Sequence, residues 1–284
     1  MFKFLRNKNK QDPPDDQPEP SVRDALLAER PSDILWDWAQ RGKLPEVLPD
    51  LEVLRGVSQL PAHRDNAFIH TLKVVDAIEP TPVRRWAALL HDIGKGPAYI
   101  ETPEGRSRFF EHDNIGAAMV PEIMESANED KDLIEHVRRL VSLHMRPISY
   151  NPEWTDAAVR RLREEAEDGR GEEGWRDILA LARADLRGYL PEPIHRGLWV
   201  LDQLEARAQR LLEQDRQAAI EREEAPRSPL DGHRILELSD RTPGPWIAEL
   251  KDHLLAEVQA GRLDVDDVPS AEAVALDWLA QHTD

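Results

Sequence analysis

Apolar side chains recur every three or four positions along most of the sequence, and this helical spacing constrains the fold more than any other feature. Strand signals are sparse, and the exception is a loop or short hairpin over 97–108 with Glu104 and Gly105 at its turn. We therefore expect an all-α fold. One helix is predicted to begin after Ser21. Further helices are predicted at about 33–41, 67–78, 84–92, 111–127, 131–145, 156–167, 175–188 and 195–224, with two more near 245–260 and 271–281.

Proline-rich and polar stretches divide the sequence into five parts. Residues 7–20 are too polar and too rich in proline to bury a core, so they are predicted to be disordered. A long apolar stripe within 195–224 predicts a connecting helix that packs against its own domain. A dimeric coiled coil is less favoured, because no clean heptad repeat persists past Leu212. The parts are a disordered tail (1–20), an N-terminal helical segment (21–60), a helical bundle (61–190), the long connecting helix (191–225) and a small C-terminal helical domain (226–284).

The sequence is acidic, with 37 Lys and Arg against 55 Asp and Glu in 284 residues, which gives a formal net charge of −18. Because phosphate contacts need basic residues in excess, we expect no broad nucleic-acid surface and no docking on anionic lipid. No apolar run reaches the roughly 18 residues of a membrane span, and Met1–Lys10 is too short for a signal sequence. We therefore predict a cytoplasmic protein without membrane contact.

Cysteine is absent, so the sequence excludes disulfides, a thiolate nucleophile and any zinc site built on cysteine. A transition-metal site must then use His, Asp and Glu, and ten histidines are available. One of them, His136, is expected on a more solvated face of its helix.

Four polar residues stand where the helical pattern places the core. His91 and Asp92 directly follow the apolar run 86–90, and His144 and Asp185 fall on the apolar faces of two later helices. A buried carboxylate is unfavourable unless it is paired or binds a cation. Each residue alone is more often explained by a hydrogen bond in the core, but a shared metal ion would satisfy all of them at once.

The order of these residues in the sequence resembles the HD-domain metal-dependent phosphohydrolase superfamily. The stretches that carry the resemblance are HTLKVVD (70–76), WAALLHDIGK (86–95), FFEHDNIGA (109–117), LVSLH (140–144) and ARADLRG (182–188). The resemblance implies an HD domain over 61–190, folded as a helical bundle with an N-terminal helical extension and a small C-terminal tail domain.

The resemblance also implies the metal ligands. One metal ion is expected on His70, His91, Asp92 and Asp185, and in two-metal members His112 and His144 bind a second ion that Asp92 bridges. A set of imidazoles and carboxylates suits Mn, Fe, Co, Ni or Zn, with Mg possible.

Two cations are candidates for contact with a substrate phosphate. Lys95, three residues past Asp92, is expected to act in catalysis with Asp92 and to bind a phosphate oxygen, and Arg146 is a second, weaker candidate. Each is equally well explained as a surface cation at the C-terminal end of a helix, where the helix dipole favours positive charge.

The flanking stretches narrow the resemblance. Residues 44–59 and 228–263 resemble the HD-containing C-terminal half of bacterial tRNA nucleotidyltransferases and poly(A) polymerases, which favours a nucleotide or RNA-end substrate such as a 2′,3′-cyclic phosphate or a 2′-nucleotide. The head domain of those transferases has no counterpart in the sequence, so CCA addition is not expected from this chain alone. Gly96 stands where the family often has Pro, and Glu111 stands where it often has Gly.

Three functions remain open from the sequence. The first is a metal-dependent phosphohydrolase acting as a phosphomonoesterase or phosphodiesterase on a small phosphorylated substrate or RNA end. The second is a non-catalytic helical module that binds tRNA or protein and works with a separate nucleotidyltransferase head, or as a homodimer. The third is a regulator that binds a nucleotide without turnover. The complete ligand set and Lys95 favour the first.

Overall fold

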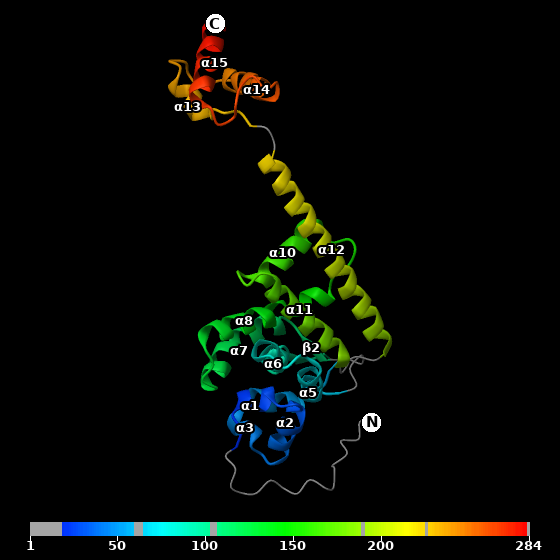
Figure 1. Ribbon diagram of the computed structural model, residues 1–284. Coiled ribbons are helices and arrows are strands. Elements are labelled where there is room, and N and C mark those ends of the chain that lie inside the picture. The colour runs from blue at the N-terminus through cyan, green and yellow to red at the C-terminus, as the bar shows by residue number, and fades with distance from the viewer. Residues whose placement is uncertain (1–18, 60–64, 103–106, 189–190, 225–226, 283–284) are drawn as a thin grey trace. The chain divides into compact units, whose positions relative to one another are not determined.

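The computed structural model describes residues 19–59, 65–102, 107–188, 191–224 and 227–282 (Figure 1). It confirms the all-α fold, because helices form nearly all of the regular structure in these ranges and the only sheet in them has two short strands. Most of the predicted disordered tail and the turn at Glu104 and Gly105 lie outside the described residues. The chain divides into two compact units, Met1–Leu211 and Leu212–Asp284. The finer five-part division stays a prediction.

The first unit contains most of the helices. They are α1 (Val22–Leu27), α2 (Pro31–Gln40), α3 (Leu44–Val47), α4 (Pro49–Val53), α5 (Ala67–Ala77), α6 (Pro82–Leu90), α7 (His112–Ser126), α8 (Lys131–Leu143), α9 (Met145–Ile148), α10 (Asp156–Glu167), α11 (Glu172–Asp185) and the start of α12 (Pro191–Glu224). Three short 3-10 helices accompany them: η1 (Leu54–Gly56), η2 (Ile93–Lys95) and η3 (Leu186–Gly188).

Side-chain caps fix where the two central helices begin. The Asn66 side chain accepts a hydrogen bond of 2.9 Å from the backbone of Ile69 at the start of α5. Thr81 caps α6 in the same way, and Pro82 occupies its first position, where a missing N–H is harmless. Every residue from Arg85 to Leu90 is buried, so α6 lies in the core, and α1, α5, α8 and α11 pack around it.

The only sheet in the described ranges is a hairpin between η2 and α7. Strands β1 (Tyr99–Glu101) and β2 (Ser107–Phe109) pair antiparallel, with Tyr99 opposite Phe109. This confirms the short hairpin that the sequence left as one of two possibilities. Because η2 lies just before the hairpin and α7 just after it, the hairpin joins two segments that also pack on each other.

The second unit forms a small helical core of its own. It contains α13 (Gly232–Glu237), α14 (Trp246–Gln259) and α15 (Val268–Gln281), and α13 was not predicted. The boundary between the units falls inside α12, whose earlier residues Leu204, Ala208 and Leu211 belong to the core of the first unit. Among the described helices, none combines the length and hydrophobicity needed to cross a membrane.

The structure corrects the expectation that His136 lies on a solvated face of its helix. Its side chain is buried, with 4% of the residue exposed, and its Nε2 lies 3.5 Å from Oδ2 of Asp177 on α11. The prediction of a solvated face was wrong because α11 packs against this side of α8, and the pattern within α8 alone does not reveal that neighbour.

The burial of His136 predicts a pH-dependent stability. Burial, with Arg170 nearby, lowers the pKa of His136 to about 4, whereas an unfolded histidine titrates near 6.5. Between these values the unfolded chain holds a proton that the folded chain lacks, so the free energy of unfolding rises with pH. We expect this residue to make the protein about 1–2 kcal/mol less stable at pH 5 than at pH 7. Urea unfolding of wild type and His136→Gln at both pH values tests this, and equal pH slopes in the two proteins would contradict it.

Gly94 allows the turn after α6 to lie against α7. A methyl group on its Cα would lie 2.1 Å from the carbonyl oxygen of His112 and 2.5 Å from the backbone nitrogen of Gly116. Both partners are backbone atoms, which cannot rotate away. The absence of a side chain at Gly94 therefore sets how closely His91 and Asp92 approach His112.

Replacing Gly94 by alanine should separate η2 from α7. We expect Gly94→Ala to lower the free energy of unfolding by about 1–3 kcal/mol, the range of an overpacked core. Gly56→Ala is the matched control, because a methyl group there meets no atom within 4 Å. Chemical denaturation of the two variants measures the difference. A Gly94→Ala protein as stable as the control would refute the close approach.

Candidate metal centre

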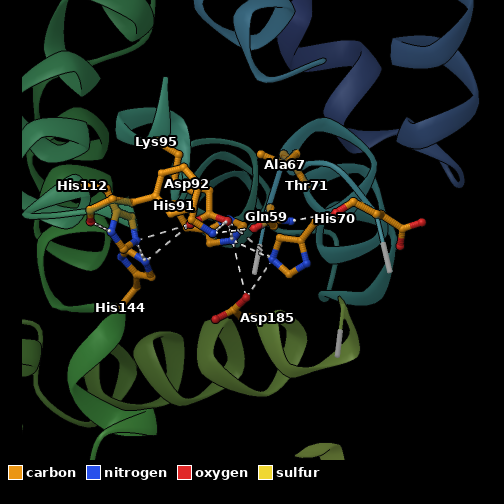
Figure 2. A network of polar contacts seen from close by, with 12 residues as sticks. Gln59, Ala67, His70, Thr71, His91, Asp92, Lys95, His112, His144 and Asp185 are labelled. Carbon is orange, nitrogen blue, oxygen red and sulfur yellow. Dashed lines mark hydrogen bonds and ion pairs between the residues drawn. The ribbon is translucent and has the colours of Figure 1, made fainter. Parts of the chain in front are cut away.

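Two groups of three buried side chains lie side by side at the centre of the first unit (Figure 2). The first triad is His70, His91 and Asp185, and the second triad is Asp92, His112 and His144. In each triad one potential ligand atom per residue lies within 4.8 Å of the others. The structure thus brings together all six residues that the sequence analysis named as metal ligands.

The first triad joins three helical segments. His70 comes from α5, His91 directly follows α6, and Asp185 is the last residue of α11. Nε2 of His70 lies 2.8 Å from Oδ1 of Asp185 and 3.3 Å from Nε2 of His91, and His91 Nε2 lies 3.6 Å from the same Asp185 oxygen. Their donor atoms therefore converge on one small volume.

The second triad lies beside α7 and α8. Nε2 of His112, the first residue of α7, is 3.3 Å from Nε2 of His144, which directly follows α8. Oδ1 of Asp92 lies 3.5 Å from the His112 nitrogen and 3.9 Å from the His144 nitrogen.

Asp92 connects the two triads. While its Oδ1 faces His112 and His144, its Oδ2 lies 3.2 Å from Nε2 of His91 and 3.6 Å from Nε2 of His70. One carboxylate thus presents a different oxygen to each triad, which is the arrangement a bridging ligand needs. Figure 2 shows Asp92 in the middle of the network, between His70 and the pair His112 and His144.

Backbone carbonyls orient three of the imidazoles. Nδ1 of His91, His112 and His144 lies 2.8, 3.0 and 2.6 Å from the carbonyl oxygen of the residue three positions earlier. A carbonyl only accepts, so each Nδ1 carries a proton and each Nε2 faces the centre, where it can bind a metal ion in place of a proton. This pairing of one ring nitrogen with a carbonyl is typical of histidines that bind metal ions.

The electrostatics of the centre favour a cation. Burial would raise the pKa of Asp92, but His91 and Lys95 hold it well below its usual range, and His70 and His91 do the same for Asp185. Burial also opposes a charged His91, yet the two carboxylates outweigh it and raise the pKa of His91 to about 10. Burial lowers the pKa of His144 to about 4. Two buried carboxylates therefore stay anionic, and a positive charge at His91, from a proton on Nε2 or from a metal ion in its place, balances them.

The donor set fits divalent metal ions. Imidazole nitrogens facing each other at 3.3 Å repel when both carry lone pairs, and a cation between them removes that repulsion. His70, His91 and Asp185 would hold one ion and His112 and His144 a second, with Asp92 shared. Four imidazoles and two carboxylates suit Mn, Fe, Co, Ni or Zn better than Mg.

Lys95 lies at the edge of this centre and is itself nearly buried, with 8% of the residue exposed. Its Nζ donates to Oδ2 of Asp92 over 2.6 Å and to Oε1 of Gln59 over 2.7 Å. Its predicted position next to Asp92 agrees with these contacts, although its contact with a phosphate stays a prediction. Gln59 is a residue that sequence reasoning missed, because its stretch carried only the family resemblance and no chemical signal of its own.

Arg146 lies elsewhere in the hydrogen-bond network. Its guanidinium pairs with Glu165 on α10. Across the described ranges, no hydrogen bond or ion pair joins it to either triad. The structure therefore gives Arg146 a structural partner and leaves its role in phosphate binding as a prediction.

The backbone of Glu111, which stands where the family resemblance led us to expect glycine, has a left-handed conformation. It directly precedes His112 and has φ 56° and ψ 24°, in the left-handed region. Glycine adopts this conformation without penalty, whereas a residue with a side chain pays about 1–2 kcal/mol. This left-handed backbone lets α7 begin at His112, and a glycine at this position would adopt it at lower cost.

The sequence matches the model of the HD domain family over residues 80–242. The match spans more than half of the chain, so the protein belongs to the HD domain family, as the motifs predicted. The matched range includes five of the six clustered residues and begins after His70.

Curated relatives agree with the narrower resemblance. The chain is 29% identical over 229 residues to the A-adding tRNA nucleotidyltransferase of Deinococcus radiodurans. This match covers 77% of this chain and 48% of that protein. It is 36% identical over 107 residues to the multifunctional CCA protein of Pseudomonas savastanoi, a match that covers 36% of this chain and 25% of that protein. It is 29% identical over 171 residues to the multifunctional CCA protein of Cupriavidus metallidurans, a match that covers 58% of this chain and 40% of that protein. The chain spans about half or less of the length of these relatives.

The geometry predicts how metal content depends on each carboxylate. Asp92→Ala removes a ligand from both triads and is expected to abolish metal binding, whereas Asp185→Ala affects the first triad alone and should leave about one ion bound. Elemental analysis after dialysis against Mn²⁺ measures the number of ions per chain.

The exposed Asp132→Ala variant is the control and should match wild type. Circular dichroism checks that each variant is folded. An Asp92→Ala protein that holds as many ions as wild type would show that this carboxylate does not bridge the triads.

Proposed function

We propose that the protein is a metal-dependent phosphohydrolase that cleaves a phosphomonoester or phosphodiester of a nucleotide or RNA end, such as a 2′,3′-cyclic phosphate. The observation that carries the proposal is the position of Asp92, whose two oxygens face two imidazole-rich triads. A pair of metal ions bridged by a carboxylate is a recurrent arrangement in enzymes that hydrolyse phosphate esters. When bound, such ions supply Lewis acidity and neutralise the charge that develops on the phosphoryl group.

The residues of the chain hold and orient this chemistry. The carbonyl partners of His91, His112 and His144 keep their rings fixed and their Nε2 atoms directed inward. Asp92 and Asp185 provide two negative charges and Lys95 one positive charge. Two divalent ions would therefore leave an excess of positive charge, which attracts a phosphate despite the overall net charge of −18.

Lys95 is the group we assign to the substrate phosphate. Its ammonium lies between Asp92 and Gln59, so it is positioned beside the centre before any substrate enters. Three N–H donors allow it to keep one carboxylate contact and add a phosphate oxygen. Asp92 contacts Lys95 as well as the imidazoles, so it positions Lys95 beside the metal ligands. Arg146 is a secondary candidate, and it must break its ion pair with Glu165 to reach a phosphate.

The names of the relatives favour a nucleotide or RNA-end substrate. They are described as an A-adding tRNA nucleotidyltransferase and multifunctional CCA proteins, and an HD-type hydrolase related to them is expected to act on similar ends. The same similarity supports a second candidate, a tRNA- or protein-binding module that works with a separate nucleotidyltransferase head. That module would keep the fold and the tRNA contact but need no turnover.

The two candidates differ in a direct assay. The purified protein is tested on p-nitrophenyl phosphate, bis-p-nitrophenyl phosphate and 2′,3′-cyclic AMP with added Mn²⁺, Ni²⁺ or Mg²⁺. We expect hydrolysis that a chelator abolishes and added metal restores, and a loss of about 100-fold or more in kcat/KM for Lys95→Ala with the metal content unchanged. If every substrate stays intact with every metal while the protein still binds tRNA, the binding module is the correct function.

A further inference from the structure

Three exposed apolar side chains lie on the hairpin between η2 and α7 or directly after it. Over the described residues nine large hydrophobic side chains are exposed, and three of them lie within 99–110: Tyr99 at 38%, Ile100 at 53% and Phe110 at 60%. Single exposed apolar residues need no explanation, whereas a contiguous group is typical of a binding surface, so the face on which each side chain lies matters.

The strand register separates the two faces of this hairpin. Tyr99 pairs with Phe109 across the strands, and their ring centroids lie 6.0 Å apart. Because successive side chains of a strand alternate, Ile100 and its partner Arg108 belong to the opposite face. The aromatic face of the hairpin is thus Tyr99 and Phe109, and Ile100 lies on the other face of the same strand.

Phe109 links the aromatic face to the candidate metal centre. Its ring centroid lies 5.5 Å from Nζ of Lys95, which is 2.6 Å from Asp92. Its carbonyl oxygen accepts the 3.0 Å hydrogen bond from Nδ1 of His112. Two independent contacts therefore fix the hairpin against the centre, and the order outward is Lys95, then Phe109, then Tyr99.

We propose that this aromatic face binds the base of the substrate, so that the substrate class is a nucleotide or nucleotide 3′ end and not a general phosphate ester. The inference rests on the proposed function, because it places the phosphate at the metal centre beside Lys95. A cation next to two aromatic rings follows the order of groups in a nucleotide, whose phosphate and base are joined by the ribose. Base stacking on aromatic side chains tolerates any base, so the face selects for a base without reading its identity.

The position of Tyr99 makes it the residue that decides this selection. Phe109 is half-buried and packs on the core, whereas Tyr99, its cross-strand partner, is exposed. Loss of the Tyr99 ring should therefore weaken contact with the base and leave the metal centre intact. Ile100→Ala removes a side chain that is even more exposed, 53% against 38%, from the opposite face of the same strand, and it is the control.

The test compares substrates with and without a base. Hydrolysis of 2′,3′-cyclic AMP is measured against glycerol 1,2-cyclic phosphate in the metal-loaded protein. We expect Tyr99→Ala to raise KM for the cyclic nucleotide about tenfold with kcat nearly unchanged, and to leave kcat/KM for the base-free substrate unaltered. Tyr99→Phe should retain the wild-type KM, and Ile100→Ala should behave as wild type on both substrates.

A binding experiment separates this inference from the proposed function. Calorimetry measures the affinity of the metal-loaded protein for adenosine 2′-monophosphate and for ribose 5-phosphate. If wild type hydrolyses neither cyclic substrate but binds the nucleotide more tightly through Tyr99, the hydrolase proposal fails and the aromatic face stands. If hydrolysis occurs but Tyr99→Ala affects both substrates equally or neither, the aromatic face is overturned and the hydrolase stands. A wild type that binds both ligands equally also overturns it.

Discussion

The convergence of imidazole lone pairs and carboxylates on one small volume is the constraint on which the rest of the first unit depends. Four imidazoles and two carboxylates meet with donor atoms about 3–4 Å apart, where an isolated set of such groups would be driven apart or drawn into water. Five helical segments hold them in place, and burial of the surrounding apolar side chains supplies the favourable free energy. A divalent cation bound between these groups would compensate for their desolvation.

The backbone contributes as much to this centre as the side chains. Gly94 lets the turn after α6 touch the start of α7, and Glu111 adopts a left-handed conformation so that α7 begins at His112. The carbonyl of Phe109 then fixes the His112 ring, and the Phe109 side chain extends toward Tyr99. Ligand orientation and the aromatic surface are thus produced by the same short segment, which is why the centre and the hairpin are expected to act on one substrate.

Most helices could be predicted because their signals are local, and so could the four clustered residues that interrupt apolar patterns. The other two, His70 and His112, came only from the family resemblance. Helical spacing is a property of neighbouring residues, so α10, for example, spans the predicted 156–167. His136 was placed wrongly because its burial depends on α11, more than 30 residues away in the sequence. Gln59 was missed for the same reason, since its contact with Lys95 joins segments 36 positions apart.

The sequence by itself determined the helical class, the membership of the HD domain family and which side chains are available to bind metal, because periodicity and motif order are written along the chain. Only the tertiary structure decided that these side chains form two triads, that Asp92 lies between them with one oxygen toward each, and that Lys95 and the hairpin border the same centre. Distances between residues far apart in sequence follow from the packing of helices against one another, and that packing is a property of the folded chain.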